Sequence, residues 1–186
     1  MKAKDIRKGA ILMYKDAPHR VMNFEHRTPG NLRAFVQVTM RNLKSGAQSD
    51  TRFSSTEDIP EADVFSYKAT FTYADGETYY FMNTTSYEQV PISLELLGDG
   101  RFYLQDGMEV DILEFNGNPI GITLPKTVVL TVAETEPELK GATASNSPKP
   151  ATTETGLTVS VPPFIKVGER IIVDTEEARY VSRAES

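Results

Sequence analysis

The sequence predicts an all-β protein with three small β-barrels in tandem, at residues 1–63, 64–126 and 127–186. Throughout the 186 residues, apolar side chains alternate with polar ones over short runs, which is typical of half-buried strands. Turn-forming pairs, Asp75-Gly76 and Asn116-Gly117, separate several of these runs. Because the helical segment expected near residues 92–97 is short, strands must supply most of the core.

The first third is expected to form a small barrel. Its apolar runs predict four strands, at residues 11–14, 19–24, 34–43 and 51–54. A turn at residues 44–46 separates the last two strands, and a loop at residues 25–33 separates the middle two.

The middle third suits an OB-like barrel, which combines five strands with a short helix. Two hairpins are predicted around the Asp-Gly and Asn-Gly turns, because both pairs tolerate positive φ. Their strands are expected at residues 64–73, 77–82, 108–115 and 120–124.

The last third has similar strand spacing and is expected to form a second OB-like barrel. Residues 141–150 have the composition of a loop, and Leu157, Val159 and Val161 alternate as a strand does. Pro162-Pro163 should end that strand, because proline lacks a backbone donor. A further strand is predicted at residues 171–173.

Composition excludes several classes of site. The chain has no cysteine and two histidines, so disulfides, thiolate metal sites and cysteine nucleophiles are excluded, and no metal or cofactor is expected. The first ten residues are charged, without the apolar run of a signal peptide, and no segment reaches the length of a membrane span. We therefore expect a soluble cytoplasmic protein without a membrane partner.

The charge distribution is uneven. Residues 1–56 contain eleven lysines and arginines against four acidic residues, whereas the whole chain has a net charge of −6. A basic segment in an acidic protein suggests that this segment meets a polyanion such as RNA. The alternative is an ordinary solvated charged surface.

The predicted loop at residues 25–33 is the strongest candidate for a binding element. Pro29 fixes φ and Gly30 permits positive φ, so the pair predicts a tight projecting turn. His26, Arg27 and Arg33 place hydrogen-bond donors and positive charge around it, and arginine suits phosphate binding and base stacking. A surface hairpin without a partner is the alternative interpretation.

Three segments resemble the bacterial translation elongation factor P family. They are Thr-Pro-Gly followed by Ala34-Phe35, the run YADGETYYFMNTTSYEQV at residues 73–90, and the C-terminal segments KPAT, VPPFI, GERIIVDT and YVSR. The resemblance implies a KOW/SH3-like barrel followed by two OB-fold barrels, with an elongated, L-like shape that approximates a tRNA. It also implies a monomeric factor that binds the ribosome beside peptidyl-tRNA, contacts ribosomal RNA, and relieves stalls at consecutive prolines.

The same resemblance implies three groups of contact residues. The loop that approaches the tRNA acceptor end would be Pro29, Gly30, Asn31, Leu32 and Arg33. The family usually has a lysine or arginine, often modified, where Asn31 stands, so this loop is expected to act unmodified or through Arg33. An mRNA-side loop would be Gly141, Ala142 and Thr143, where Ala142 replaces a common aspartate, and Tyr180 and Arg183 would contact ribosomal and tRNA backbone.

Other functions are less well supported by the residues. An enzyme is not expected, because the chain has neither a phosphate-binding glycine loop nor a Gly-x-Ser-x-Gly elbow, and we assign no catalytic residue. A free single-stranded RNA-binding OB protein is a second possibility, although the acidic middle and last thirds argue against it. Because of Asn31, a divergent paralogue of the family with an altered ribosomal role is a third.

Overall fold

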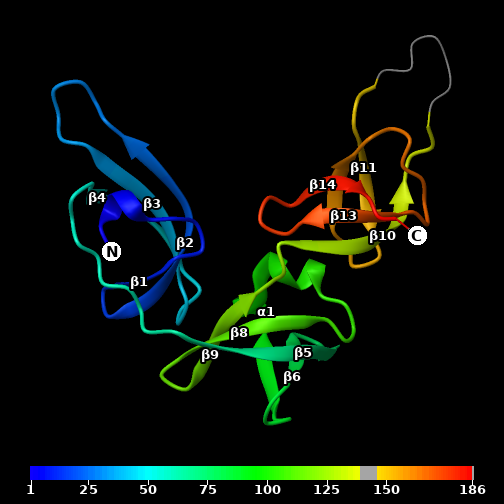
Figure 1. The fold of residues 1–186 in the computed structure, drawn as a ribbon, viewed down its shortest axis with the longest axis horizontal. Helices are drawn as coiled ribbons and strands as arrows, with labels where there is room; N and C mark the ends of the chain where they lie inside the picture. Colours follow the sequence, from blue (N-terminus) through cyan, green and yellow to red (C-terminus); the bar gives the residue numbers. More distant parts are fainter. Residues whose placement is uncertain (139–145, 186) are drawn as a thin grey trace. The chain divides into compact units, whose positions relative to one another are not determined.

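The computed structural model describes residues 1–138 and 146–185 and divides the chain into two compact units (Figure 1). The first unit holds residues 1–67 and 112–121, and the second holds residues 68–111 and the described residues from 122 onward. Within the described residues, three sheets of four, five and five strands confirm the predicted all-β class. The domain boundaries after residues 63 and 126 stay a prediction.

The first sheet confirms the four strands predicted for the N-terminal third. Its order is β1-β2-β3-β4, with the bounds β1 Ile11–Tyr14, β2 Ala17–Arg27, β3 Phe35–Asn42 and β4 Gln48–Ser54. A short 3₁₀ helix, η1, covers Ala3–Asp5. Alternate residues of β3, namely Val36, Val38 and Met40, are fully buried, as a period of two requires. Because β2 continues through Arg27, the loop that follows it is shorter than predicted and spans residues 28–34.

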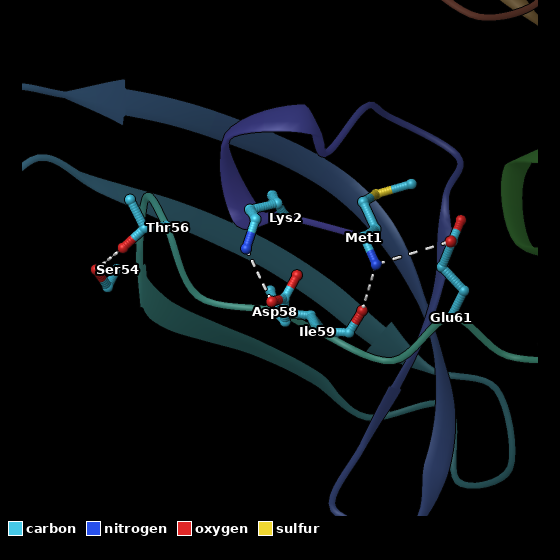
Figure 2. A network of polar contacts seen from close by, with 7 residues as sticks. All are labelled: Met1, Lys2, Ser54, Thr56, Asp58, Ile59 and Glu61. Atoms are coloured by element: carbon cyan, nitrogen blue, oxygen red, sulfur yellow. Dashed lines mark hydrogen bonds and ion pairs between the residues drawn. The ribbon is translucent and has the colours of Figure 1, made fainter.

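Polar contacts fasten the start of the chain to the segment after β4 (Figure 2). The Met1 ammonium donates to the Ile59 carbonyl oxygen at 3.0 Å and lies 3.8 Å from a Glu61 carboxylate oxygen. Lys2 Nζ lies 2.8 Å from Asp58 Oδ2, and this contact holds the pKa of Asp58 below its usual range. These exposed pairs are individually weak, but they keep the 58–61 segment against the first sheet.

The second sheet has the order β7-β6-β5-β8-β9. Its elements are β5 Phe65–Asp75, β6 Thr78–Asn83, β7 Gln89–Ser93, α1 Leu94–Leu97, the 3₁₀ helix η2 Gly98–Tyr103, β8 Glu109–Phe115 and β9 Asn118–Thr123. Asn116 and Gly117 both have positive φ (51° and 79°), which confirms the predicted hairpin turn. The helical segment predicted at residues 92–97 is confirmed only from Leu94, because Ile92 and Ser93 belong to β7. Pro91 is tolerated within β7 because β7 is an edge strand.

The third sheet has the order β12-β11-β10-β13-β14. Its strands are β10 Thr127–Thr135, β11 Lys149–Thr153, β12 Thr158–Val161, β13 Arg170–Asp174 and β14 Arg179–Arg183. β12 ends directly before Pro162, as predicted. The prediction of a loop through residue 150 is wrong at its end, because Pro150 belongs to β11. Pro150 pairs with Ser160 of β12, whereas the pairing of β11 with β10 begins at Ala151. Pairing with β10 therefore does not require the backbone N–H that Pro150 lacks.

The middle third contributes directly to the core of the last five strands. Tyr103, at the end of η2, is 4% exposed and packs in one cluster with ten buried residues of the C-terminal segment. Phe102, Met108 and Leu124 pack around this cluster. The Gln105 side-chain amide also donates to the Val129 carbonyl oxygen at 2.7 Å. Residues of the middle third and of the last third therefore form one core.

Candidate functional site

The loop at residues 28–34 forms the tip of the long β2–β3 hairpin (Figure 1). The Leu32 amide donates to the Pro29 carbonyl oxygen at 2.9 Å, so Gly30 and Asn31 are the central residues of a β-turn. Neither has positive φ, so this turn does not use the positive φ that glycine permits at position 30. Pro29 starts the turn instead of occupying its centre, and both central residues can adopt the negative φ of a type I turn.

The backbone at the tip is open to an approaching partner. A Cβ atom added to Gly30 would meet none of the described residues within 4 Å. Gly30, Asn31, Leu32 and Arg33 are all exposed, and Leu32 is 74% exposed. Neither the backbone conformation nor a close neighbour requires glycine at position 30. The lack of a side chain there lets a ligand come close to the backbone.

Arg33 is the available cation of this loop. Arg27 forms an ion pair with Glu25, because its Nη2 atom lies 3.0 Å from Glu25 Oε2. By contrast, Arg33 forms no hydrogen bond or ion pair within residues 1–138 and 146–185. Its exposed guanidinium can therefore meet a phosphate without first breaking an internal contact.

The base of the loop is held by the sheet. The β2–β3 register ends at the pair Arg27–Phe35, and the Ser55 amide donates to the Ala34 carbonyl oxygen at 3.1 Å. The Arg52 guanidinium carbon lies 4.1 Å from the centre of the Phe35 ring. The tip is thus a short exposed segment on a fixed support.

Tyr180 and Arg183 both lie on β14, and a β-bulge places them on the same face. Tyr180 pairs with Val173 and Arg183 with Ile171, while the register shifts between Ile172 and Val173. Residues opposite each other in an antiparallel pair project from the same face. Without the extra residue Val181, two positions three residues apart would point to opposite faces.

A turn held by Asp174 precedes β14. Asp174 Oδ1 accepts hydrogen bonds from the amides of Glu177 and Glu176 at 2.8 and 2.9 Å. The bond from Glu177 is the main reason that the pKa of Asp174 lies below its usual range. The carboxylate therefore stays ionised near neutral pH and fixes the chain just before Tyr180.

The two side chains of β14 differ in their surroundings. Tyr180 is half-buried and packs against the C-terminal core cluster, so its ring has a structural role beside any RNA contact. The Arg183 side chain is 58% exposed, and its Nη1 atom lies 3.7 Å from Glu169 Oε1. The third predicted group, Gly141, Ala142 and Thr143, lies outside the described residues.

The described residues offer neither a metal-binding cluster nor a membrane-spanning helix. Among residues 1–138 and 146–185, no group of three or more His, Asp or Glu side chains could hold a metal ion. Within the same residues, no helix is both long and apolar enough to cross a membrane.

Comparison with known proteins identifies the family. Three family models match successive segments: the elongation factor P KOW-like domain at residues 2–59, the elongation factor P OB domain at 66–122, and the elongation factor P C-terminal domain at 128–183. The chain belongs to the elongation factor P family. These matches confirm the predicted KOW-like and OB components and make the chain a translation elongation factor.

Individual relatives extend over nearly the whole chain. Elongation factor P of Acidobacterium capsulatum is 50% identical over 98% of both chains. The proteins of the same name from Gemmatimonas aurantiaca and Thermotoga petrophila are 41% and 43% identical, over 98% and 97% of this chain and 97% of each relative. The chain is therefore similar to these relatives along nearly its whole length.

Proposed function

We propose that this protein binds the ribosome beside peptidyl-tRNA and stimulates peptide-bond formation, relieving stalls at consecutive prolines. The observation that carries the proposal is the exposed loop tip, with an open backbone at Gly30 and, among the described residues, no partner for the Arg33 guanidinium. The protein would act in the cytoplasm as a monomer, with peptidyl-tRNA and ribosomal RNA as its partners.

The loop would act by positioning the tRNA acceptor end. Asn31 has no ammonium group to modify, and no lysine occurs between Lys15 and Lys44. The remaining contacts are the loop backbone and Arg33, both on the fixed support of the β2–β3 hairpin. Holding a reactant in its productive orientation lowers the entropic part of the barrier without a catalytic group.

A free single-stranded RNA-binding protein is the second candidate, and one observation favours it. Tyr73 and Tyr80 stack with ring centres 4.6 Å apart, and Tyr73 is 49% exposed. Exposed aromatic rings on an OB-like sheet can stack bases. However, Asp75 and Glu77 lie on either side of Gly76 at the turn of this hairpin, and their negative charges repel the phosphates of a nucleic acid.

Equilibrium binding separates the two candidates. We expect the protein to bind bacterial ribosomes that carry peptidyl-tRNA, with an affinity that falls as salt rises, and not to bind a free single-stranded RNA oligonucleotide. Tyr73→Ala serves as the control variant and should bind these ribosomes like the unchanged protein. Binding to the oligonucleotide that Tyr73→Ala abolishes would support the second candidate and contradict the first.

A further inference from the structure

An aromatic ring and a carboxylate both lie next to Arg183. The Arg183 guanidinium carbon is 5.2 Å from the centre of the Phe164 ring, and Phe164 is 43% exposed. Glu169 Oε1 also lies 3.7 Å from Arg183 Nη1. Neither neighbour was singled out from the sequence, because 19 and 14 positions separate them from Arg183.

The aromatic contact leaves the arginine able to bind an anion. A cation–π contact leaves a guanidinium with N–H donors that can still bind an oxygen acceptor. Within residues 1–138 and 146–185, the side chain of Arg183 donates no hydrogen bond. Its donors therefore form no hydrogen bond in the described part of the chain, and Nη1 has a charge contact with Glu169.

The carboxylate is fixed and only loosely paired with the arginine. Glu169 Oε2 accepts the Lys166 amide at 3.0 Å, which holds the carboxylate on the turn before β13. The 3.7 Å separation from Arg183 is too long for a hydrogen bond, so the pair is a weak charge contact. A phosphate would have to replace this contact in order to bind.

We propose that Phe164 is a positioning residue that presents the Arg183 guanidinium to a phosphate of RNA, and that Glu169 competes with that phosphate for Arg183. This inference rests on the proposed contact of Arg183 with RNA. The last barrel would then contain a three-residue site for an RNA phosphate. In this site the Phe164 ring holds the Arg183 guanidinium in its binding position, and the Glu169 carboxylate lowers the affinity for the phosphate.

Three single substitutions test the site by equilibrium binding to bacterial ribosomes that carry peptidyl-tRNA. Arg183→Ala should weaken binding about ten-fold, because one charged contact is lost. Phe164→Leu keeps an apolar side chain but removes the aromatic face, and should weaken binding about three-fold. Glu169→Gln keeps an oxygen for the Lys166 amide but removes the charge, and should strengthen binding about two-fold.

A second set of variants separates positioning from packing. In the Arg183→Ala background, Phe164→Leu and Glu169→Gln should have no further effect on binding, because both act through the guanidinium. Phe164→Tyr keeps the aromatic face and should bind like the unchanged protein. The thermal midpoint of each variant shows whether folding has changed, and Glu169→Gln tests the site even where Phe164→Leu is unstable.

The possible outcomes distinguish this inference from the function on which it rests. If Arg183→Ala weakens binding while Phe164→Leu and Glu169→Gln leave it unchanged, Arg183 contacts RNA but the three-residue site is wrong. An equal effect of Phe164→Leu with and without Arg183 would also overturn the site. If Arg183→Ala itself binds normally, both the RNA contact of Arg183 and the site are wrong.

Discussion

Replacing Tyr103 with alanine should lower the free energy of unfolding by about 3–5 kcal/mol, the usual cost of removing a large buried aromatic side chain. Tyr103 is 4% exposed and lies among the buried side chains of the last five strands, although it comes from the middle third. The substitution would leave a cavity in that core. It would also remove a principal contact between η2 and the C-terminal strands.

Urea denaturation followed by circular dichroism measures this loss. Tyr103→Phe is the matched control, because it keeps the ring and removes only the hydroxyl; it should cost less than about 1.5 kcal/mol. Burial raises the pKa of Tyr103, so the hydroxyl is un-ionised near neutral pH and no charge is lost in the control. A loss below about 1 kcal/mol for Tyr103→Ala would mean that the two segments do not depend on this ring.

Arg33→Ala should reduce the rescue of proline stalls about ten-fold, because one charged contact to RNA, worth about 1.4 kcal/mol, is removed. Arg33 is exposed and has no internal partner among the described residues, so its loss should leave the thermal midpoint unchanged. The rate of synthesis through a proline run in a reconstituted translation system measures the effect.

Two variants and one mass measurement complete this experiment. Asn31→Ala should reduce rescue less than about two-fold, because a neutral exposed side chain contributes little to binding RNA phosphate. Arg33→Lys should recover part of the activity, since it keeps the charge but not the planar fork. Full activity of Arg33→Ala would refute the role of Arg33, and an adduct on Arg33 in the intact mass of natively expressed protein would refute the unmodified loop.

Local chemistry explains which parts of the fold could be predicted from the sequence. The turn at Asn116-Gly117 and the end of β12 at Val161 depend on φ preferences and on the missing donor of proline, and both were predicted correctly. The same reasoning failed where a neighbouring strand decides the outcome. Pro91 and Pro150 both lie within strands, because neither position requires the donor that proline lacks.

The candidate site shows the same limit. The projecting loop and its exposed arginine were predicted from residues 25–33, but the turn is centred on Gly30 and Asn31, one residue later than the expected Pro29-Gly30. The bulge at Val181 and the approach of Phe164 to Arg183 depend on pairing between distant segments. Periodicity along the chain carries no information about such contacts.

The most direct test of the proposed function compares two messages in a reconstituted bacterial translation system, with and without this protein. One message encodes three consecutive prolines, and the other is identical except that alanines replace the prolines. We expect the protein to accelerate synthesis through the proline run and to leave the alanine message nearly unchanged. Equal acceleration of both messages, or no acceleration of either, would contradict a role in relieving proline stalls.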